Sequence, residues 1–292
     1  MESKNKCEMC PRKCGADRKK TCGFCGASDT IKVAKIMLHN WEEPCISIGK
    51  GSGAIFFSNC PLKCIFCQNY EISQLGAGRE ISVSELVDYM KLLEEKGAEN
   101  INLVSPTQYT KQILEALKTY KPKVPVVWNT NSYENIEELK LLDGLVDIFL
   151  ADLKYVSPIL SKEYSGCADY FDKASKAILT MRGMVKDVFD GEKMLEGLIV
   201  RHLVLPGATE DSKDVFDWIN TYLGKNTIVS VMNQYVPYYK AKNHKLLNRK
   251  VTALEYNRVC DYVLNLGFEN GYFQSDESAC EEYIPNFTQF LD

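Results

Sequence analysis

The chain has 292 residues, of which 45% are hydrophobic and 25% are charged, and its formal net charge is -4. This composition is typical of a folded globular protein of one large or two average domains, and it argues against disorder. Because the net charge is negative, the chain as a whole does not attract nucleic acid or an anionic membrane. No apolar run reaches the roughly 18 residues of a membrane span. We expect a cytoplasmic protein without a nucleic-acid or membrane partner.

Cysteine is unusually frequent, with twelve residues in the chain. Eight of them fall in two clusters within the first 67 residues. Because the chain begins with a charged stretch and not with a signal-peptide pattern, clustered cysteines indicate metal binding and not disulfides. We interpret the four scattered cysteines as packing residues, since a free thiol behaves as a small hydrophobe; these are Cys45, Cys167, Cys260 and Cys280.

The first cluster lies in a short polar segment, residues 1–30, which is too small to form a core of its own. A metal would supply the missing folding energy. Two Cys-x2-Cys pairs around a basic loop are typical of a four-cysteine zinc site, with one further cysteine between them. Spacing leaves zinc and a second iron-sulfur cluster open. We predict a metal-binding segment, residues 1–30, ahead of a domain that covers residues 31–292; its candidate ligands are Cys7, Cys10, Cys14, Cys22 and Cys25.

The second cluster, Cys60, Cys64 and Cys67, has C-x3-C-x2-C spacing and follows an apolar strand pattern at residues 54–58. Thiolates select zinc, copper(I) or iron-sulfur clusters. An electron-carrying four-iron cluster takes four thiolates, so three would leave one iron open for a ligand that is not protein, which makes it a reaction site. A zinc site with a distant fourth ligand and ordinary buried cysteines are the alternatives.

Beyond residue 70 the chain alternates helical and strand patterns. This alternation predicts a parallel sheet covered by helices. Six strands are fewer than the eight of a closed barrel, so the pattern indicates an open, partial barrel. Helices are expected at residues 82–95, with Ser82 or Ser84 as the cap, and at 109–120, 134–142, 173–184, 211–222 and 253–266; strands are expected at 54–58, 101–104, 124–128, 146–151, 198–205 and 227–235.

Polar side chains recur where these strands end. In parallel α/β barrels the chemistry lies at the carboxyl ends of the strands. The residues singled out there are Ser105, Thr107, Asn129, Asp152, Lys154 and Arg201. His202 neighbours Arg201 on one strand, so its side chain should point the opposite way, into the packing. We interpret His39 and His244 as non-catalytic.

The motif C-x3-C-x-Phe-C after a strand resembles that of the radical S-adenosylmethionine (SAM) enzymes. Residues 51–73, with the Trp-Glu-Glu-Pro sequence at 41–44, resemble the pyruvate formate-lyase activating-enzyme-like branch. The resemblance implies a partial (β/α)6 TIM-like barrel of the radical SAM type. It also implies a 4Fe-4S cluster on Cys60, Cys64 and Cys67, with SAM on the fourth iron and Phe66 near the adenine.

The same resemblance suggests roles for the residues after the strands. Ser105 and Thr107 occupy the place where many relatives carry Gly-Gly-Glu against the methionine amino group. Asn129 begins a stretch that resembles Asp-Thr-Asn-Gly, while the Asp-Leu-Lys at 152–154 matches an element that lies beside SAM in activating enzymes. In some relatives two aspartates hold a monovalent cation there, and Asn129 replaces the first of them.

Arg201 lies in an Arg-x3-Leu-Pro-Gly element that reaches SAM in relatives, in keeping with a guanidinium that forks onto a carboxylate. In the N-terminal segment, the family pattern C-x-x-C-P-R-x-C-G followed by G-F-C-G matches four of the five cysteines, namely Cys7, Cys10, Cys14 and Cys25. Cys22 is then an additional cysteine.

The implied activity is reductive cleavage of SAM to a 5'-deoxyadenosyl radical that abstracts hydrogen from a substrate. For the activating-enzyme-like branch, this substrate would be a glycine of a glycyl radical enzyme, and a flavodoxin or ferredoxin would be the reducing partner. A small molecule or a peptide is the second hypothesis. A non-enzymatic alternative is an iron-sulfur electron carrier or a zinc-dependent binding module.

Overall fold

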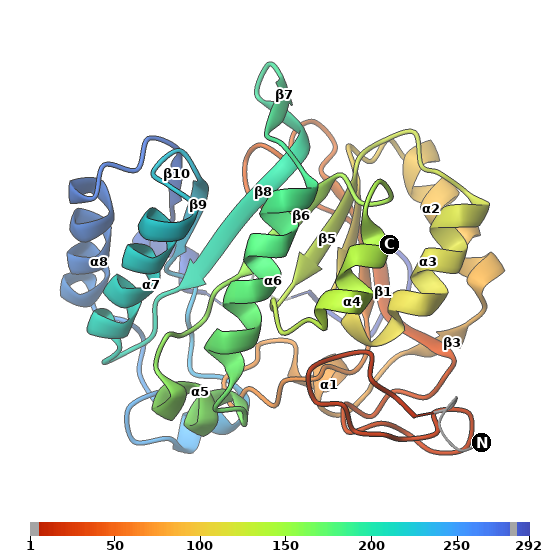
Figure 1. Cartoon of the computed structure of the whole chain (residues 1–292), viewed down its shortest axis with the longest axis horizontal. Helices are drawn as coiled ribbons and strands as arrows, with labels where there is room; N and C mark the ends of the chain where they lie inside the picture. The colour runs from red at the N-terminus through yellow and green to blue at the C-terminus, as the bar shows by residue number, and fades with distance from the viewer. Residues whose placement is uncertain (1–5, 281–284) are drawn as a thin grey trace.

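A computed structural model describes residues 6–280 and 285–292 of the chain. Its centre is a ten-stranded sheet with helices along its outer face (Figure 1). The strands are β1 (Ile31–His39), β2 (Ser52–Phe57), β3 (Arg79–Ile81), β4 (Ile101–Val104), β5 (Val126–Thr130), β6 (Ile148–Asp152), β7 (Val188–Asp190), β8 (Lys193–Leu203), β9 (Ile228–Met232) and β10 (Gly271–Phe273).

The helices follow the strands in alternation from β4 onward. The α-helices are α1 (Tyr70–Ser73), α2 (Val83–Glu95), α3 (Thr110–Thr119), α4 (Ile136–Leu139), α5 (Pro158–Ser165), α6 (Tyr170–Met184), α7 (Thr209–Tyr222) and α8 (Ala253–Asn265). Short 3-10 helices are η1 (Thr107–Tyr109), η2 (Lys140–Leu142), η3 (Tyr239–Asn243) and η4 (Asp276–Ser278). No helix within the described ranges is both long and apolar enough to cross a membrane.

The sheet runs in the order β10-β9-β8-β6-β5-β4-β2-β1-β3, with β7 paired to β8 outside this path. All neighbours from β2 to β10 are parallel, whereas β1 is antiparallel to both β2 and β3. The two ends of the sheet, β10 and β3, do not meet. The predicted open α/β barrel is thus confirmed, and its six predicted strands correspond to β2, β4, β5, β6, β8 and β9.

Several expected boundaries need correction. The sequence analysis missed β1, β3, β7, β10, α1 and α5. The helix expected at 134–142 divides into α4 and η2. Strand β8 begins five residues before the expected residue 198, because β7 pairs with its first part in an antiparallel hairpin that turns at Gly191, where φ is +61°. Ser82 caps α2 in a capping box with Glu85.

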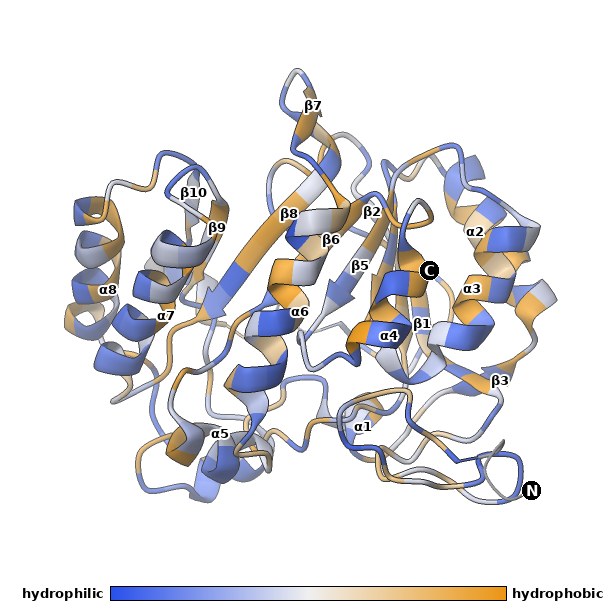
Figure 2. Cartoon of the chain, in the orientation of Figure 1, coloured by the Kyte–Doolittle hydropathy of each residue, from blue (hydrophilic) through white to orange (hydrophobic). Residues whose placement is uncertain are grey.

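The main core lies between the sheet and the helices. Along each strand, alternate side chains point to opposite faces. The outward set packs against the apolar faces of the helices; it includes Ile55, Leu103, Trp128, Phe149, Val200 and Val229 from the strands and Leu86, Ile113, Leu139, Ile178, Val215 and Val259 from the helices. In Figure 2, β8 is hydrophobic along much of its length and hydrophilic at its carboxyl end.

The inward-facing residues near the carboxyl ends of the strands form a continuous row. Asp152 pairs with Arg201 across β6 and β8, and Arg201 pairs with Ser230 across β8 and β9. On the other side, Asn129 pairs with Val104 across β5 and β4. Strand register alone therefore brings polar side chains from β5, β6, β8 and β9 to one edge of the barrel interior.

The N-terminal segment packs against this same edge, below α4 and beside α1 in Figure 1. The guanidinium of Arg12 donates to the main-chain carbonyls of Pro61 (3.0 Å) and Gly166 (2.9 Å). Arg18 donates to the carbonyl of Gln108 (2.5 Å). The cysteine-rich segment is thus bound directly to the loops that follow β2 and β4.

Candidate active site

The loop between β2 and α1 carries the three-cysteine motif. It leaves the strand at Asn59, whose φ of +71° lies in the left-handed region that asparagine tolerates. The Asn59 side chain donates to the Tyr109 hydroxyl at 3.0 Å. A Cβ built on Gly26 would lie 2.8 Å from Asn59 Oδ1, so the N-terminal segment approaches this turn closely and needs glycine there.

The thiols of Cys60, Cys64 and Cys67 line one cavity of about 560 Å³. Each sulfur has a polar neighbour: Asn131 Nδ2 donates to Cys60 at 3.4 Å, Ser165 Oγ lies 3.0 Å from Cys64, and Ser73 Oγ lies 3.2 Å from Cys67. Burial raises the pKa of all three thiols, and that of Cys67 reaches about 11. Binding of a metal would therefore have to displace three protons.

This donor set fits an open four-iron cluster. Within residues 6–280 and 285–292, no three Cys, His, Asp or Glu side chains surround one point closely enough for a single metal ion. A four-iron cluster does not need that arrangement, because each thiolate binds a different iron. Two buried thiols and one half-buried thiol at the wall of a cavity can hold three irons and leave the fourth accessible to a ligand in the cavity.

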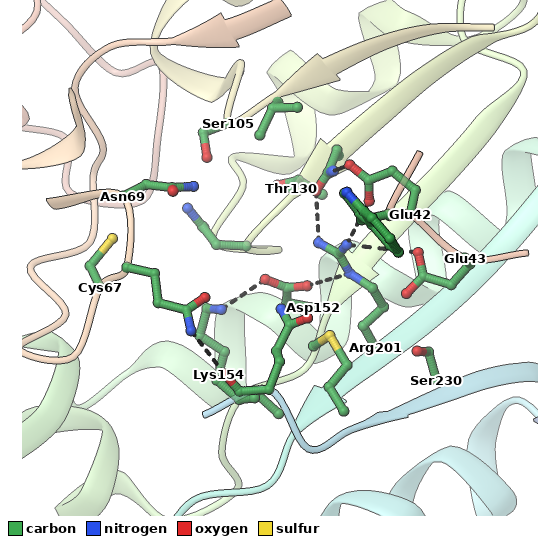
Figure 3. Close-up of a pocket in the computed structure, with 18 of the residues that line it drawn as sticks. Glu42, Glu43, Cys67, Asn69, Ser105, Thr130, Asp152, Lys154, Arg201 and Ser230 are labelled. Atoms are coloured by element: carbon green, nitrogen blue, oxygen red, sulfur yellow. Dashed lines mark hydrogen bonds and ion pairs between the residues drawn. The ribbon is translucent and has the colours of Figure 1, made fainter. Parts of the chain in front are cut away.

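A charged row crosses the cavity beside this loop (Figure 3). Asp152, at the end of β6, accepts from Lys154 Nζ at 2.7 Å and from Arg201 Nε at 2.9 Å. Arg201, on the neighbouring β8, also donates to Asn129 Oδ1 at 2.7 Å and to Glu42 Oε2 at 3.2 Å. Four sequence-predicted residues are thereby connected in one network.

The row is electrostatically coupled. Burial alone would raise the pKa of Asp152, but the charges of Arg201 and Lys154 outweigh it and hold that pKa below its ordinary value. Burial raises the pKa of Glu42 and of Glu43, while the Arg201 charge opposes the rise. Asp152 is therefore the carboxylate that stays ionised most firmly, and it fixes both cations in place.

A buried carboxylate outside the cavity holds the neighbouring loop. Glu134 Oε1 accepts from Thr107 Oγ1 (2.8 Å), Trp128 Nε1 (3.1 Å) and Thr130 Oγ1 (2.6 Å). These three donors come from η1 and β5. The network ties the end of β5 to the start of η1 and so supports the loop from which Asn131 reaches Cys60.

The remaining predicted residues divide between cavity and packing. Phe66 and Ser105 line the cavity, and Phe66 lies 6.1 Å from Tyr235, measured between ring centroids. Thr107 does not line it; its hydroxyl donates to Glu134 instead. His202 points into the helix layer, where Nδ1 lies 2.7 Å from the Leu153 carbonyl oxygen, in agreement with the alternation argument. None of the five N-terminal cysteines lines the cavity.

Two charged residues of the cavity were not singled out from the sequence. Glu42 and Glu43 follow β1, a strand that the analysis missed, and their side chains are only 8% and 6% exposed. The available signal was the Trp-Glu-Glu-Pro sequence at 41–44, which entered only through the family resemblance. His39 also lines the cavity, and burial lowers its pKa to about 4.

Comparison with known proteins agrees with this geometry. Residues 54–219 match the family described as the radical SAM superfamily. The uncharacterized protein MJ0674 of Methanocaldococcus jannaschii is 32% identical over 265 residues, which cover 87% of this chain and 73% of that protein.

Solved structures of SuiB from Streptococcus suis are similar in fold. SuiB bound to the precursor peptide SuiA superposes with a TM-score of 0.54 and 14% identity over 74% of this chain. SuiB bound to SAM gives a TM-score of 0.52 and 15% identity, also over 74% of this chain. The chain spans about half of the SuiB length, 46% and 48% in these two cases. The three-cysteine loop, the open parallel barrel and the family match together show that the chain belongs to the radical SAM superfamily.

Proposed function

We propose that this radical SAM enzyme abstracts a hydrogen atom from a carbon of a peptide or protein substrate, with a glycine of a glycyl radical enzyme as the first candidate. The observation that carries the proposal is that the three motif thiols and the row of Asp152, Lys154 and Arg201 line the same cavity. The resemblance of residues 51–73 to activating enzymes supports the choice of a glycine.

When bound, the cluster and SAM supply the radical chemistry: one electron enters, methionine and 5'-deoxyadenosine leave, and the substrate loses one hydrogen atom. The electron requires a low-potential donor, for which we propose a flavodoxin or ferredoxin. The chain itself contributes binding and position.

The residues of the charged row are suited to the amino-acid end of SAM. The Lys154 ammonium and the Arg201 guanidinium are held on Asp152, so both can meet a carboxylate without first being ordered. Phe66 offers an aromatic face for the adenine, and the Ser105 hydroxyl is available for a polar contact at the same wall.

A small molecule or free peptide is the second candidate substrate. The cavity volume of about 560 Å³ lies within the roughly 300–1,000 Å³ of small-molecule sites. The structural neighbour SuiB has been crystallised with a precursor peptide, which supports a peptide as the occupant.

We also propose a second metal centre on the N-terminal cysteines. The sulfurs of Cys10, Cys14 and Cys25 each accept the main-chain N–H of the residue two positions later, as do Cys60 and Cys67 in the cluster loop. Such bonds favour the thiolate, the form that binds metal. The repeated local geometry supports a metal-binding role for both sets.

Four of the five N-terminal thiols are neighbours, since Cys10 lies within electrostatic range of both Cys7 and Cys25. A Cβ built on Gly23 would lie 3.4 Å from Cys14 Sγ and 3.5 Å from Cys25 Sγ. The main chain of Cys7 exchanges hydrogen bonds of 3.0 Å with residues 15 and 16, beside Cys14. Cys22 is exposed. The proposed ligands are therefore Cys7, Cys10, Cys14 and Cys25, and the metal is zinc or a second iron-sulfur cluster. Within the described residues no three of these thiols surround one point, so zinc would draw them closer together, whereas a cluster binds each thiolate on a different iron.

The central test is SAM cleavage by anaerobically reconstituted protein under dithionite. We expect 5'-deoxyadenosine from the wild type and a loss of at least about tenfold in Asp152→Asn, because the two cations lose their anchor. A purified glycyl radical enzyme, added with SAM, should acquire an organic radical signal in electron paramagnetic resonance. A wild type that binds its full cluster yet yields no 5'-deoxyadenosine would refute the proposal.

Metal analysis tests the N-terminal centre. Protein prepared without oxygen should contain, besides the cluster iron, either about one zinc or a second set of about four irons per chain. Cys10→Ser should lose this additional metal, whereas Cys22→Ser should keep it. Equal metal content in Cys10→Ser and the wild type would exclude the centre.

A further inference from the structure

Glu43 has a buried carboxylate oxygen that no hydrogen bond satisfies. Its side chain is 6% exposed and lines the cavity. The carboxylate bonds to Ser230, but among the residues that the structure describes Oε2 has no hydrogen-bond partner. The Arg201 Nη1 atom lies 3.8 Å from it, which is too long for a hydrogen bond. Buried polar atoms are rarely left in this state without a reason.

The adjacent Glu42 is different, because its carboxylate is well paired. It accepts from Asn102 Nδ2 at 2.8 Å and from Arg201 Nη1 at 3.2 Å. The remaining guanidinium nitrogens of Arg201 donate to Asp152 and Asn129. Within the described residues, the Arg201 guanidinium is thus already used by other partners, and Oε2 of Glu43 is left to a donor that a ligand brings.

The charge balance of the cavity indicates what kind of ligand fits. Among its described lining residues, Glu42, Glu43 and Asp152 oppose Lys154 and Arg201. His39 is kept neutral at pH 7 because burial lowers its pKa. With all three carboxylates ionised, one negative charge is in excess, so an additional anion would be repelled and a cation would be attracted.

The lining of the cavity favours an organic cation over a metal ion. In residues 6–280 and 285–292, no three Cys, His, Asp or Glu side chains surround a point as one metal ion would need. A nitrogen cation needs only one or two acceptors and gains from aromatic faces. Trp41 and Tyr272 line the same cavity, and both stand near Glu43, Trp41 by sequence and Tyr272 by electrostatic contact.

The position of Glu43 favours the substrate over SAM as the source of this cation. In Figure 3, Cys67 and Asn69 lie on one side of the cavity, Glu43 and Ser230 lie on the opposite side, and Asp152 is between them. Because SAM must reach the iron at the three-cysteine loop, the side at Glu43 is the part left for a second molecule.

We propose that Glu43 binds a primary ammonium group carried by the substrate, with Oε2 as the acceptor. The inference rests on the proposed function, since it assigns the cavity beyond SAM to a substrate. The ammonium can belong to a lysine side chain or to the amino terminus of a peptide. Both present the same N–H donors and the same charge.

Three probes distinguish these sources in calorimetric titration of anaerobically reconstituted, SAM-loaded protein. N-acetyl-lysine N-methylamide carries only a side-chain ammonium, norleucine N-methylamide carries only an α-ammonium, and N-acetyl-norleucine N-methylamide carries neither. We expect one of the first two to bind at least about tenfold more tightly than the third, the effect of one charge-assisted hydrogen bond. Equal binding of all three would overturn the inference.

Two variants test whether Glu43 causes the preference for the ammonium probe. Glu43→Gln keeps the shape and should reduce the preference for the ammonium probe to about twofold or less, because the charge is lost. Glu80→Gln, which removes an exposed carboxylate on β3, should retain the wild-type preference. An undiminished preference in Glu43→Gln would refute the role of Glu43.

A further probe tests the same hydrogen bond on the wild-type protein, so this result does not depend on correct folding of the variant. N-acetyl-trimethyllysine N-methylamide keeps the charge and the aromatic contact but has no N–H donor on its cation, so it should bind at least about threefold more weakly than the lysine probe. Binding as tight as that of the lysine probe would contradict a hydrogen bond to Oε2. Failure of SAM cleavage would leave these titrations interpretable, so the inference and the proposed function can fail separately.

Discussion

The ion pair between Asp152 and Arg201 permits a quantitative test of the site. It joins β6 to β8 at the wall of the cavity, with a distance of 2.9 Å between Arg201 Nε and Asp152 Oδ1, and both side chains are 14% exposed. Asp152→Asn leaves two cations without their common anion. Arg201→Met leaves Asp152 paired with Lys154. It removes the one cation that, among the described residues, lies within 4 Å of Glu42 and Glu43.

Removing one member of a buried pair costs about 3–5 kcal/mol, because the other charge stays buried without compensation. In a chain of this size each kcal/mol lowers Tm by roughly 2–4 °C, so each single variant should melt on the order of 10 °C lower. The double variant removes both charges at once. It should lose at least about 1 kcal/mol less than the sum of the two single variants.

The assay is thermal unfolding followed by circular dichroism on reconstituted protein, at one scan rate and at pH 7. Lys140→Met, which breaks an exposed pair with Glu137, is the control and should change Tm by less than about 2 °C. Additive losses in the double variant would show that Asp152 and Arg201 do not act as a pair, and the electrostatic account of the site would be wrong.

Two further predictions concern the cluster loop and the packing layer. Cys64→Ala should abolish the SAM-responsive cluster signal in electron paramagnetic resonance, whereas Cys167→Ala, a buried cysteine outside the motif, should preserve it. Burial lowers the pKa of His202 from 6.5 to about 4, so protons bind the unfolded chain preferentially and stability is lost as pH falls through this interval. Between pH 7 and pH 5 the wild type should therefore lose about 2 kcal/mol more than His202→Gln, as measured by urea unfolding; parallel losses would contradict the assignment.

Local patterns were sufficient for the parallel part of the barrel. Most of its six predicted strands are short apolar runs followed by a helix with apolar residues at helical spacing, and both signals can be read from neighbouring residues alone. The Arg201 and His202 orientations followed from the two-residue period of a strand. Cys60, Cys64 and Cys67 were recognisable because a cluster loop needs closely spaced ligands.

Strand β1 and the buried Glu42 were missed because each depends on a charge pairing with a residue far away in the sequence. Strand β1 contains Lys35, which breaks the apolar pattern; its ammonium is buried because it pairs with Asp292 (2.5 Å) and donates to the Asn286 carbonyl (2.7 Å), more than 250 residues away. Glu42 likewise reads as a surface residue, since its partner Arg201 lies 159 positions further on. No local pattern encodes either pairing.

The β7–β8 hairpin has a consequence for how this protein can vary between species. Its tip projects from the end of the sheet opposite the cavity, and every residue of β7 is exposed. An insertion at Gly191 would only lengthen the projection. One extra residue between Gly197 and Arg201 would instead reverse every later side chain of β8, so that His202 would enter the cavity and Arg201 the helix layer. Insertions and deletions among homologues should therefore be found at the hairpin tip and not in the part of β8 that pairs with the parallel sheet.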